Sequence, residues 1–152
     1  MDVKAMLKEK GADYEVIRHE HTYTAQEVAA SEHVTGHMFA KPVILRSGDE
    51  SFMFVLPASR HVALKRASEL VGKDLAMATE EDMKRIFPDC EIGAEPPFGS
   101  PYDVPTYVDE SLAEMDDIVF RAGNHDETIK MAYEEYARIE TPTVAAFCIE
   151  DE

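Results

Sequence analysis

The chain has 152 residues, 45% of them hydrophobic and 30% charged, a balance typical of one folded domain of about 100–150 residues. Its formal net charge of −16 should repel nucleic acid at long range. No apolar run approaches the roughly 20 residues of a membrane helix, and the N-terminus lacks the pattern of a secretory signal. We therefore expect a cytoplasmic, single-domain protein spanning residues 1–152.

The charge is unevenly distributed along the chain. Residues 86–152 carry 3 basic and 17 acidic groups, whereas residues 41–85 carry 8 and 7. The middle segment can therefore present a local basic face, although each of its cations can equally be an ordinary solvated side chain. The two cysteines, Cys90 and Cys148, stand alone, which predicts neither a disulfide framework nor a zinc knuckle and fits a reduced compartment.

The N-terminal quarter predicts a helix, a strand and a second helix. Val3, Met6 and Leu7 share one helical face. Gly11 then stands where a C-terminal cap is expected. Residues 14–18 have strand character, and Thr24 with Glu27 forms a capping box that starts a helix through residues 25–29.

The middle of the chain predicts a hairpin followed by two helices. Apolar runs at 42–45 and 51–56 are joined by a turn at 47–50. A helix ending before Gly72 and another beginning at Thr79 follow. The apolar residues assigned to the first of these helices are Val62, Leu64, Ala67, Leu70 and Val71.

The C-terminal part begins with a long shaped loop. Residues 93–106 hold three clusters of glycine or proline, which predict this loop before a strand at 107–108. Further strands are expected at 117–121 and 127–130, then a helix at 132–139 and a last strand at 144–149. Because strands and helices do not alternate regularly, the order favours an α+β fold with a mixed sheet.

Motifs for common catalytic and metal chemistry are missing from the sequence. His33 and His37 are four residues apart, but Val34 occupies the place of the catalytic glutamate in a zinc protease motif. His19 and His21 have no further ligand at a suitable spacing. Serine-nucleophile and phosphate-loop motifs are also absent, so we predict no metal, no cofactor and no nucleotide hydrolysis.

Three features remain as candidates for a site. Lys41 is a lone cation where an apolar strand begins, which can also be a plain exposed strand end. The loop at 93–99 combines glycines, which let backbone N–H groups approach a ligand, with prolines that fix its shape. The turn at 122–126 could equally be a simple hairpin connection.

Six segments occur in the order and spacing of a known family. They are Thr22 to Ala29, Ala40-Lys41, Leu56-Pro57-Ala58, Gly93 to Gly99, Val108-Asp109-Glu110 and Ala122 to His125. Over nearly the whole chain, from about Tyr14 to Phe147, the sequence resembles the YbaK family. These are aminoacyl-tRNA deacylases related to the editing domain inserted in bacterial prolyl-tRNA synthetase.

The resemblance implies a single α+β domain with a mixed, barrel-like sheet flanked by helices. It also implies a trans-acting deacylase that hydrolyses the ester of mischarged tRNA, most simply of the tRNA-Pro type, by positioning and electrostatics without a metal or cofactor. The partner would be mischarged aminoacyl-tRNA, bound either through its acceptor end at a basic patch around Lys41, Arg60, Lys65 and Arg66 or by delivery from a synthetase, with no membrane.

By the same resemblance, catalytic roles fall on three residues, which are Lys41, Gly93 and Pro97. Lys41 would hold the terminal adenosine phosphate or backbone of the substrate, and main-chain groups of the G-x-x-x-P loop would bind its aminoacyl end. A second group of residues would bind the substrate, and His125 would contact its amino acid. Its members are Tyr23, Phe98, Gly99, Gly123, Asn124 and His125.

The sequence departs from the family at one position of the implied site. Pro42 stands where many relatives have threonine after the lysine, which removes a hydroxyl and an N–H that could contact substrate. Two other functions remain open, the first because of Pro42 and the second because of the acidic surface. One is a non-catalytic module that binds tRNA or a synthetase, and the other is a small-molecule hydrolase or binding protein that reuses the pocket.

Overall fold

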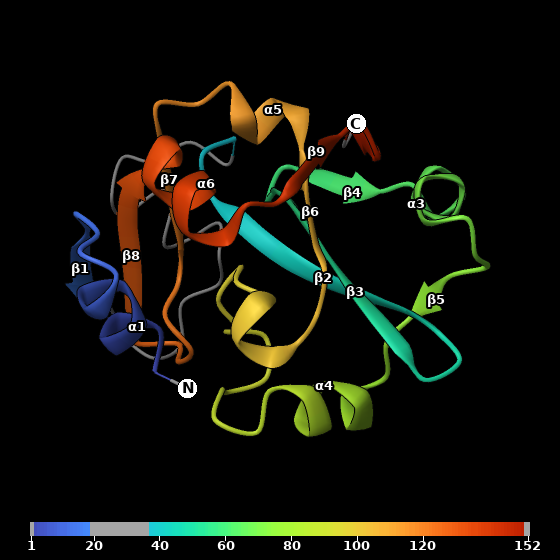
Figure 1. The fold of residues 1–152 in the computed structure, drawn as a ribbon, viewed down its shortest axis with the longest axis horizontal. Helices are drawn as coiled ribbons and strands as arrows, with labels where there is room; N and C mark the ends of the chain where they lie inside the picture. The colour runs from blue at the N-terminus through green and yellow to red at the C-terminus, as the bar shows by residue number, and fades with distance from the viewer. Residues whose placement is uncertain (1, 19–36, 151–152) are drawn as a thin grey trace.

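Two long neighbouring strands form the centre of the computed structural model, which describes residues 2–18 and 37–150 (Figure 1). Strand β2 (Ala40–Ser47) and strand β3 (Glu50–Pro57) pair antiparallel along their full lengths. The hairpin expected from the two apolar runs is therefore confirmed.

The hairpin belongs to a five-stranded sheet with the order β5-β2-β3-β6-β9. Strand β5 (Ala76–Met77) runs antiparallel to β2. Strand β6 (Thr106–Asp109) runs parallel to β3, and β9 (Thr143–Ala145) runs parallel to β6. The mixed sheet predicted from the irregular order of elements is thus present.

A second sheet has the order β1-β8-β7 and is entirely antiparallel. It consists of β1 (Glu15–Arg18), β8 (Glu127–Ala132) and β7 (Asp117–Arg121). In Figure 1 it lies with the N-terminal helix on one side of the hairpin, opposite the side that carries β5. The strands over residues 15–18 and 117–121 match the sequence prediction closely.

The described strands form three sheets and do not close into a barrel, which corrects the barrel-like expectation. The third sheet is a short pair made by β4 (Arg60–Val62) and β10 (Cys148–Glu150). The two larger sheets touch just before β2, where the Val119 N–H donates to the Met38 carbonyl at 3.0 Å. This contact brings the start of β2 against β7.

Strand β3 is buried on both faces, which explains its continuous apolar sequence. Phe52, Phe54 and Leu56 enter one hydrophobic cluster, and the alternate residues Met53 and Val55 enter the other. Because side chains alternate across a strand, one run of six residues fills both cores.

Helices cover the sheets, and their starts follow local signals. Those described are α1 (Val3–Glu9), α3 (Leu64–Val71), α4 (Glu80–Ile86), α5 (Glu110–Ala113) and α6 (Tyr133–Glu140). The helix start predicted at Thr79 is confirmed, and the structure shows a capping box between Thr79 and Asp82 there. None of the helices in the described ranges is long and apolar enough to span a bilayer.

Two expectations about packing are wrong. Of the apolar face predicted for α3, Ala67 is fully buried, whereas Leu64 and Leu70 are 41% and 42% exposed. The single last strand expected at 144–149 is divided between β9 and β10. The break falls at Phe147, whose fully buried ring packs edge-on against Phe54 at 5.0 Å, so the chain turns inward there.

Candidate functional site

The beginning of β2 and the 93–99 loop meet at a small cavity of about 40 Å³. Three chain segments contribute its lining, which consists of Phe39, Ala40, Lys41, Pro42, Gly93, Glu95 and Arg121. Lys41 and Gly93, which the sequence analysis singled out separately, therefore face the same space. Such convergence of polar groups on one cavity is what a binding or catalytic site requires.

Lys41 is half-buried at the second position of β2, and its ammonium donates to the Ala58 carbonyl at 3.4 Å. Pro42 fits the strand because β5 pairs with β2 only at Leu45 and Arg46, so one side of Pro42 needs no ladder hydrogen bond from β5. A proline also restricts the preceding residue to extended backbone. Pro42 thus helps to fix the backbone from which Lys41 projects.

The 93–99 loop is hydrogen-bonded to the turn at 122–125. The Gly123 N–H donates to the Ala94 carbonyl at 2.9 Å, and the Glu91 N–H donates to the Gly123 carbonyl at 2.9 Å. The His125 ring nitrogen Nε2 lies 2.8 Å from the Ile92 carbonyl. The two loops that the resemblance places at one pocket are therefore adjacent.

Glu95 is a buried acid at the cavity that sequence reasoning did not single out. It is 5% exposed, and its two carboxylate oxygens accept from the Gly93 N–H at 3.1 and 3.2 Å. Burial raises the pKa of Glu95, while backbone N–H groups and the nearby His125 act in the opposite direction. The left-handed φ of +85° at Gly93 is what lets the loop turn back on this carboxylate.

Arg121 is the second cavity residue that the sequence analysis missed. It ends β7 directly after three fully buried apolar residues and is itself only 6% exposed. Burial lowers the pKa of its guanidinium. A cation continuing an apolar strand is the signal that could have identified it, because such a side chain is rarely buried without a polar environment.

The second half of the loop anchors it to the core and does not line the cavity. The Pro97 carbonyl accepts from the Tyr136 hydroxyl at 2.7 Å. Phe98 is fully buried and packs edge-on against Phe120 and Tyr136, with centroid distances of 5.5 and 5.1 Å. Phe98, which the resemblance places among the substrate-binding residues, thus lies in the hydrophobic core.

Gly99, another residue expected to bind substrate, is tied to a buried carboxylate. Its N–H donates to Glu140 at 3.1 Å and to the Thr106 hydroxyl at 3.2 Å. Glu140 also accepts from the Ser100 N–H at 3.1 Å, the Ser100 hydroxyl at 2.6 Å and the Thr106 hydroxyl at 2.5 Å. This carboxylate holds the end of the loop through four donors.

Asn124 lies away from the Lys41 cavity. The Asn124 amide donates to Glu127 at 3.1 Å, its oxygen accepts from the Asp126 N–H at 2.9 Å, and it borders a separate pocket near Lys4. The structure therefore does not bring Asn124 to the Lys41 cavity. Tyr23 and the expected helix at 25–29 lie outside the described residues, as do His19, His21 and His33.

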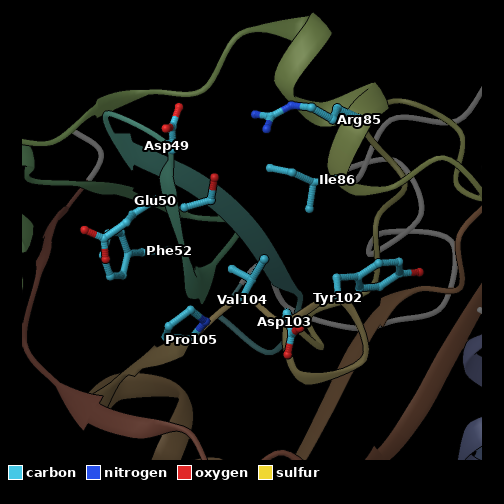
Figure 2. A pocket seen from close by; sticks show the side chains of 10 residues that line it. Asp49, Glu50, Phe52, Arg85, Ile86, Tyr102, Asp103, Val104 and Pro105 are labelled. Carbon is cyan, nitrogen blue, oxygen red and sulfur yellow. The ribbon is translucent and has the colours of Figure 1, made fainter.

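A larger pocket of about 410 Å³ lies at the opposite end of the hairpin. Figure 2 shows Asp49 and Glu50 on one side of it and Arg85 and Ile86 on the other. At about 3.3 Å per residue, the length of β2 places this pocket roughly 20 Å from Lys41. Arg85 already donates to Asp82 at 3.0 Å, and none of the predicted site residues lines this pocket.

The chemistry available at the Lys41 cavity is electrostatic. Residues 2–18 and 37–150 contain no group of three or more His, Cys, Asp or Glu side chains that could hold a metal ion. Burial raises the pKa of both Cys90 and Cys148, which keeps these thiols protonated and poorly nucleophilic. The described part of the site therefore offers two cations, one acid and backbone groups around a small, partly open cavity.

Residues 19–139 match the family model of the aminoacyl-tRNA editing domain. The chain belongs to this family. A curated relative, the multifunctional Ser/Thr-tRNA deacylase ProXp-y of Escherichia coli (strain K12), is 26% identical over 149 residues, which cover 94% of this chain and 89% of the relative. The same protein from Escherichia coli O157:H7 matches equally well.

Solved structures confirm the fold of the editing domain. A proposed trans-editing enzyme for prolyl tRNA synthetase superposes with a TM-score of 0.87 at 22% identity, covering 99% of this chain and 95% of that one. A hypothetical protein superposes with a TM-score of 0.88 at 19% identity, covering 97% and 99%. The α+β architecture with mixed sheets is thus shared with editing domains.

Proposed function

We propose that this chain is a trans-acting aminoacyl-tRNA deacylase, a hydrolase that cleaves the ester between a wrong amino acid and a tRNA. The observation that carries the proposal is the convergence of Lys41, Gly93, Glu95 and Arg121 on one cavity in a member of the editing-domain family. The name of the Escherichia coli relative, a tRNA deacylase, supports the same reaction.

The residues suit ester hydrolysis by positioning. Attack by water or by the ribose hydroxyl of the substrate needs an oriented carbonyl and stabilisation of the developing oxyanion. The ammonium of Lys41 supplies a positive charge for the phosphate or backbone of the terminal adenosine, and Arg121 places a second positive charge at the same cavity. Neither protonated thiol is required as a nucleophile.

A separate hydrolytic site compensates for the limited selectivity of synthetases between similar amino acids. A synthetase pocket discriminates against a slightly smaller or isosteric side chain by only about 1–3 kcal/mol. A second site that hydrolyses the mistakes multiplies this selectivity. A protein acting in trans could clear such products after their release.

The net charge of −16 restricts how tRNA is bound. We propose contact through the acceptor end and the local basic group formed by Lys41, Arg60, Lys65 and Arg66, or delivery by a synthetase. Arg60 lies 3.6 Å from the buried Asp109, and Arg66 donates to the Cys148 carbonyl at 2.9 Å. These contacts fix the positions of both guanidiniums.

The substrate is tested with a panel of charged tRNAs. Serine and threonine are included because of the name of the relative, and tRNA-Pro charged with alanine or cysteine is included because of the resemblance to prolyl editing domains. We expect the protein to deacylate at least one mischarged tRNA and to spare the correctly charged one.

Failure across the whole panel would contradict the deacylase assignment. Binding of tRNA or a synthetase without turnover would then support the non-catalytic module. Affinity for free amino acid or its esters, with none for tRNA, would support a small-molecule function.

A further inference from the structure

Among the described residues that line the Lys41 cavity, Glu95 contributes the sole carboxylate, and the other charged side chains are those of Lys41 and Arg121. Its side chain is nearly completely buried, and the hydrogen bond it accepts from Gly93 holds it at the edge of the same space. A carboxylate has about four lone-pair sites, so the backbone N–H groups that hydrogen-bond to Glu95 leave it with further acceptor capacity.

The size of the cavity restricts what this carboxylate can meet. A volume of about 40 Å³ accommodates a group of the size of one or a few water molecules. An ammonium group is of this size, whereas a complete aminoacyl side chain is larger. Of the three charged side chains named above, Glu95 is the one that can accept hydrogen bonds from an ammonium group, and its negative charge attracts a positive partner.

An aminoacyl ester carries one small cationic group of this kind. Its α-amino group has an ordinary pKa of about 7.7–8, so it carries a positive charge in a large fraction of molecules near pH 7. The group lies one carbon from the ester carbonyl, so whatever fixes the ammonium also positions the scissile bond.

We propose that Glu95 forms an ammonium subsite that binds the free α-amino group of the aminoacyl ester. The inference rests on the proposed deacylase function and adds a selection rule to it. Esters with a free amine are bound and hydrolysed, whereas esters whose amine is acylated lose the charge and add bulk in a cavity of only about 40 Å³. Peptidyl-tRNA and formylated initiator tRNA would then be spared.

The Glu95→Gln variant tests the role of the negative charge in binding the amine while the structure of the 93–99 loop is kept. A glutamine amide oxygen can still accept from the Gly93 N–H, so the local turn is retained, but the negative charge is lost. Glu114→Gln, at an exposed position after α5, serves as the matched control. Thermal unfolding of each variant verifies that the fold is retained.

Binding is measured by calorimetry with a hydrolysis-resistant analogue, an adenosine that carries the amino acid on a 3′-amide. The analogue is used with a free or an acetylated α-amine, and single-turnover deacylation of the corresponding tRNAs is measured in parallel. We expect wild-type protein and Glu114→Gln to prefer the free amine by about ten-fold or more, as for loss of one charge-assisted hydrogen bond. In Glu95→Gln this preference should fall to about three-fold or less.

Equal binding of both analogues by wild-type protein, or an unchanged preference in Glu95→Gln, would overturn the ammonium subsite. Preference for the free amine without hydrolysis of any tRNA would contradict the deacylase function and support the subsite. Hydrolysis of tRNA without discrimination at the amine would support the deacylase function and contradict the ammonium subsite.

Discussion

The buried Glu140 carboxylate should be one of the largest single contributors to stability, because it holds the end of the 93–106 loop. It is 5% exposed and lies on the inner face of α6, where it accepts from Gly99, Ser100 and Thr106. The Glu140→Ala substitution would remove all of these hydrogen bonds at once, because the carboxylate is their shared acceptor.

The loss in the free energy of unfolding follows from the donors that no longer have an acceptor in Glu140→Ala. The Gly99 N–H keeps the Thr106 hydroxyl oxygen as an acceptor at 3.2 Å, so the main losses fall on the Ser100 N–H and the Thr106 hydroxyl. The buried Thr106 hydroxyl left without an acceptor costs about 1–3 kcal/mol, and the part-buried Ser100 N–H and the space left by the side chain add to this, so we expect a loss of about 3–5 kcal/mol. For a domain of this size that lowers the Tm by about 6–20 °C.

Urea unfolding followed by circular dichroism measures this loss, with Glu134→Gln at an exposed position of the same helix as the control. The control should change the free energy of unfolding by less than about 0.5 kcal/mol. A loss in Glu140→Ala as small as that of the control would refute the assignment of Glu140 as the anchor of the loop.

Two further predictions concern the loop and the N-terminal helix. Gly99→Ala should destabilise the fold and slow deacylation, because an added Cβ would collide with the Val104 carbonyl and the Thr106 hydroxyl; wild-type thermal stability in this variant would contradict the packing described. Lys4 donates to Glu127 at 2.9 Å and is the largest cause that lowers the pKa of this carboxyl below its ordinary 4.5. The stability from this pair is present above about pH 4.5 and is lost as the pH falls through the folded pKa. Lys4→Met should therefore cost about 1–2 kcal/mol at pH 7 and much less at pH 3 in urea unfolding, whereas an equal cost at both pH values would contradict the ion-pair account.

Local signals were sufficient to predict most elements of the fold. The β2–β3 hairpin, the helix start at Thr79 and the strand at 117–121 depend on residues close together in sequence, so their patterns are readable. The division of the last strand was not predictable in this way, because it depends on Phe147 reaching Phe54 across the sheet. The exposure of Leu64 and Leu70 has the same origin, since the sequence gives a helix face but not what covers it.

The candidate site was predicted in part. Lys41 and Gly93 could be named from the resemblance and do line one cavity, yet Glu95 and Arg121 were missed because their importance depends on burial. Glu140 carries a readable signal, since it falls on the same helical face as Tyr133 and Tyr136. A carboxylate on a buried face requires donors, but the sequence does not reveal that Gly99 and Ser100 provide them.

The most direct test of the account is the rate of deacylation by Lys41→Ala on the best tRNA of the panel. Lys8→Ala, at an exposed position of α1 outside the cavity, is the matched control, and thermal unfolding verifies the fold of both variants. We predict that Lys41→Ala lowers kcat/KM by about 100-fold or more, the effect of removing one well-placed electrostatic group, with an unchanged Tm. A folded Lys41→Ala protein that deacylates as fast as Lys8→Ala would contradict the assignment of this cavity as the active site.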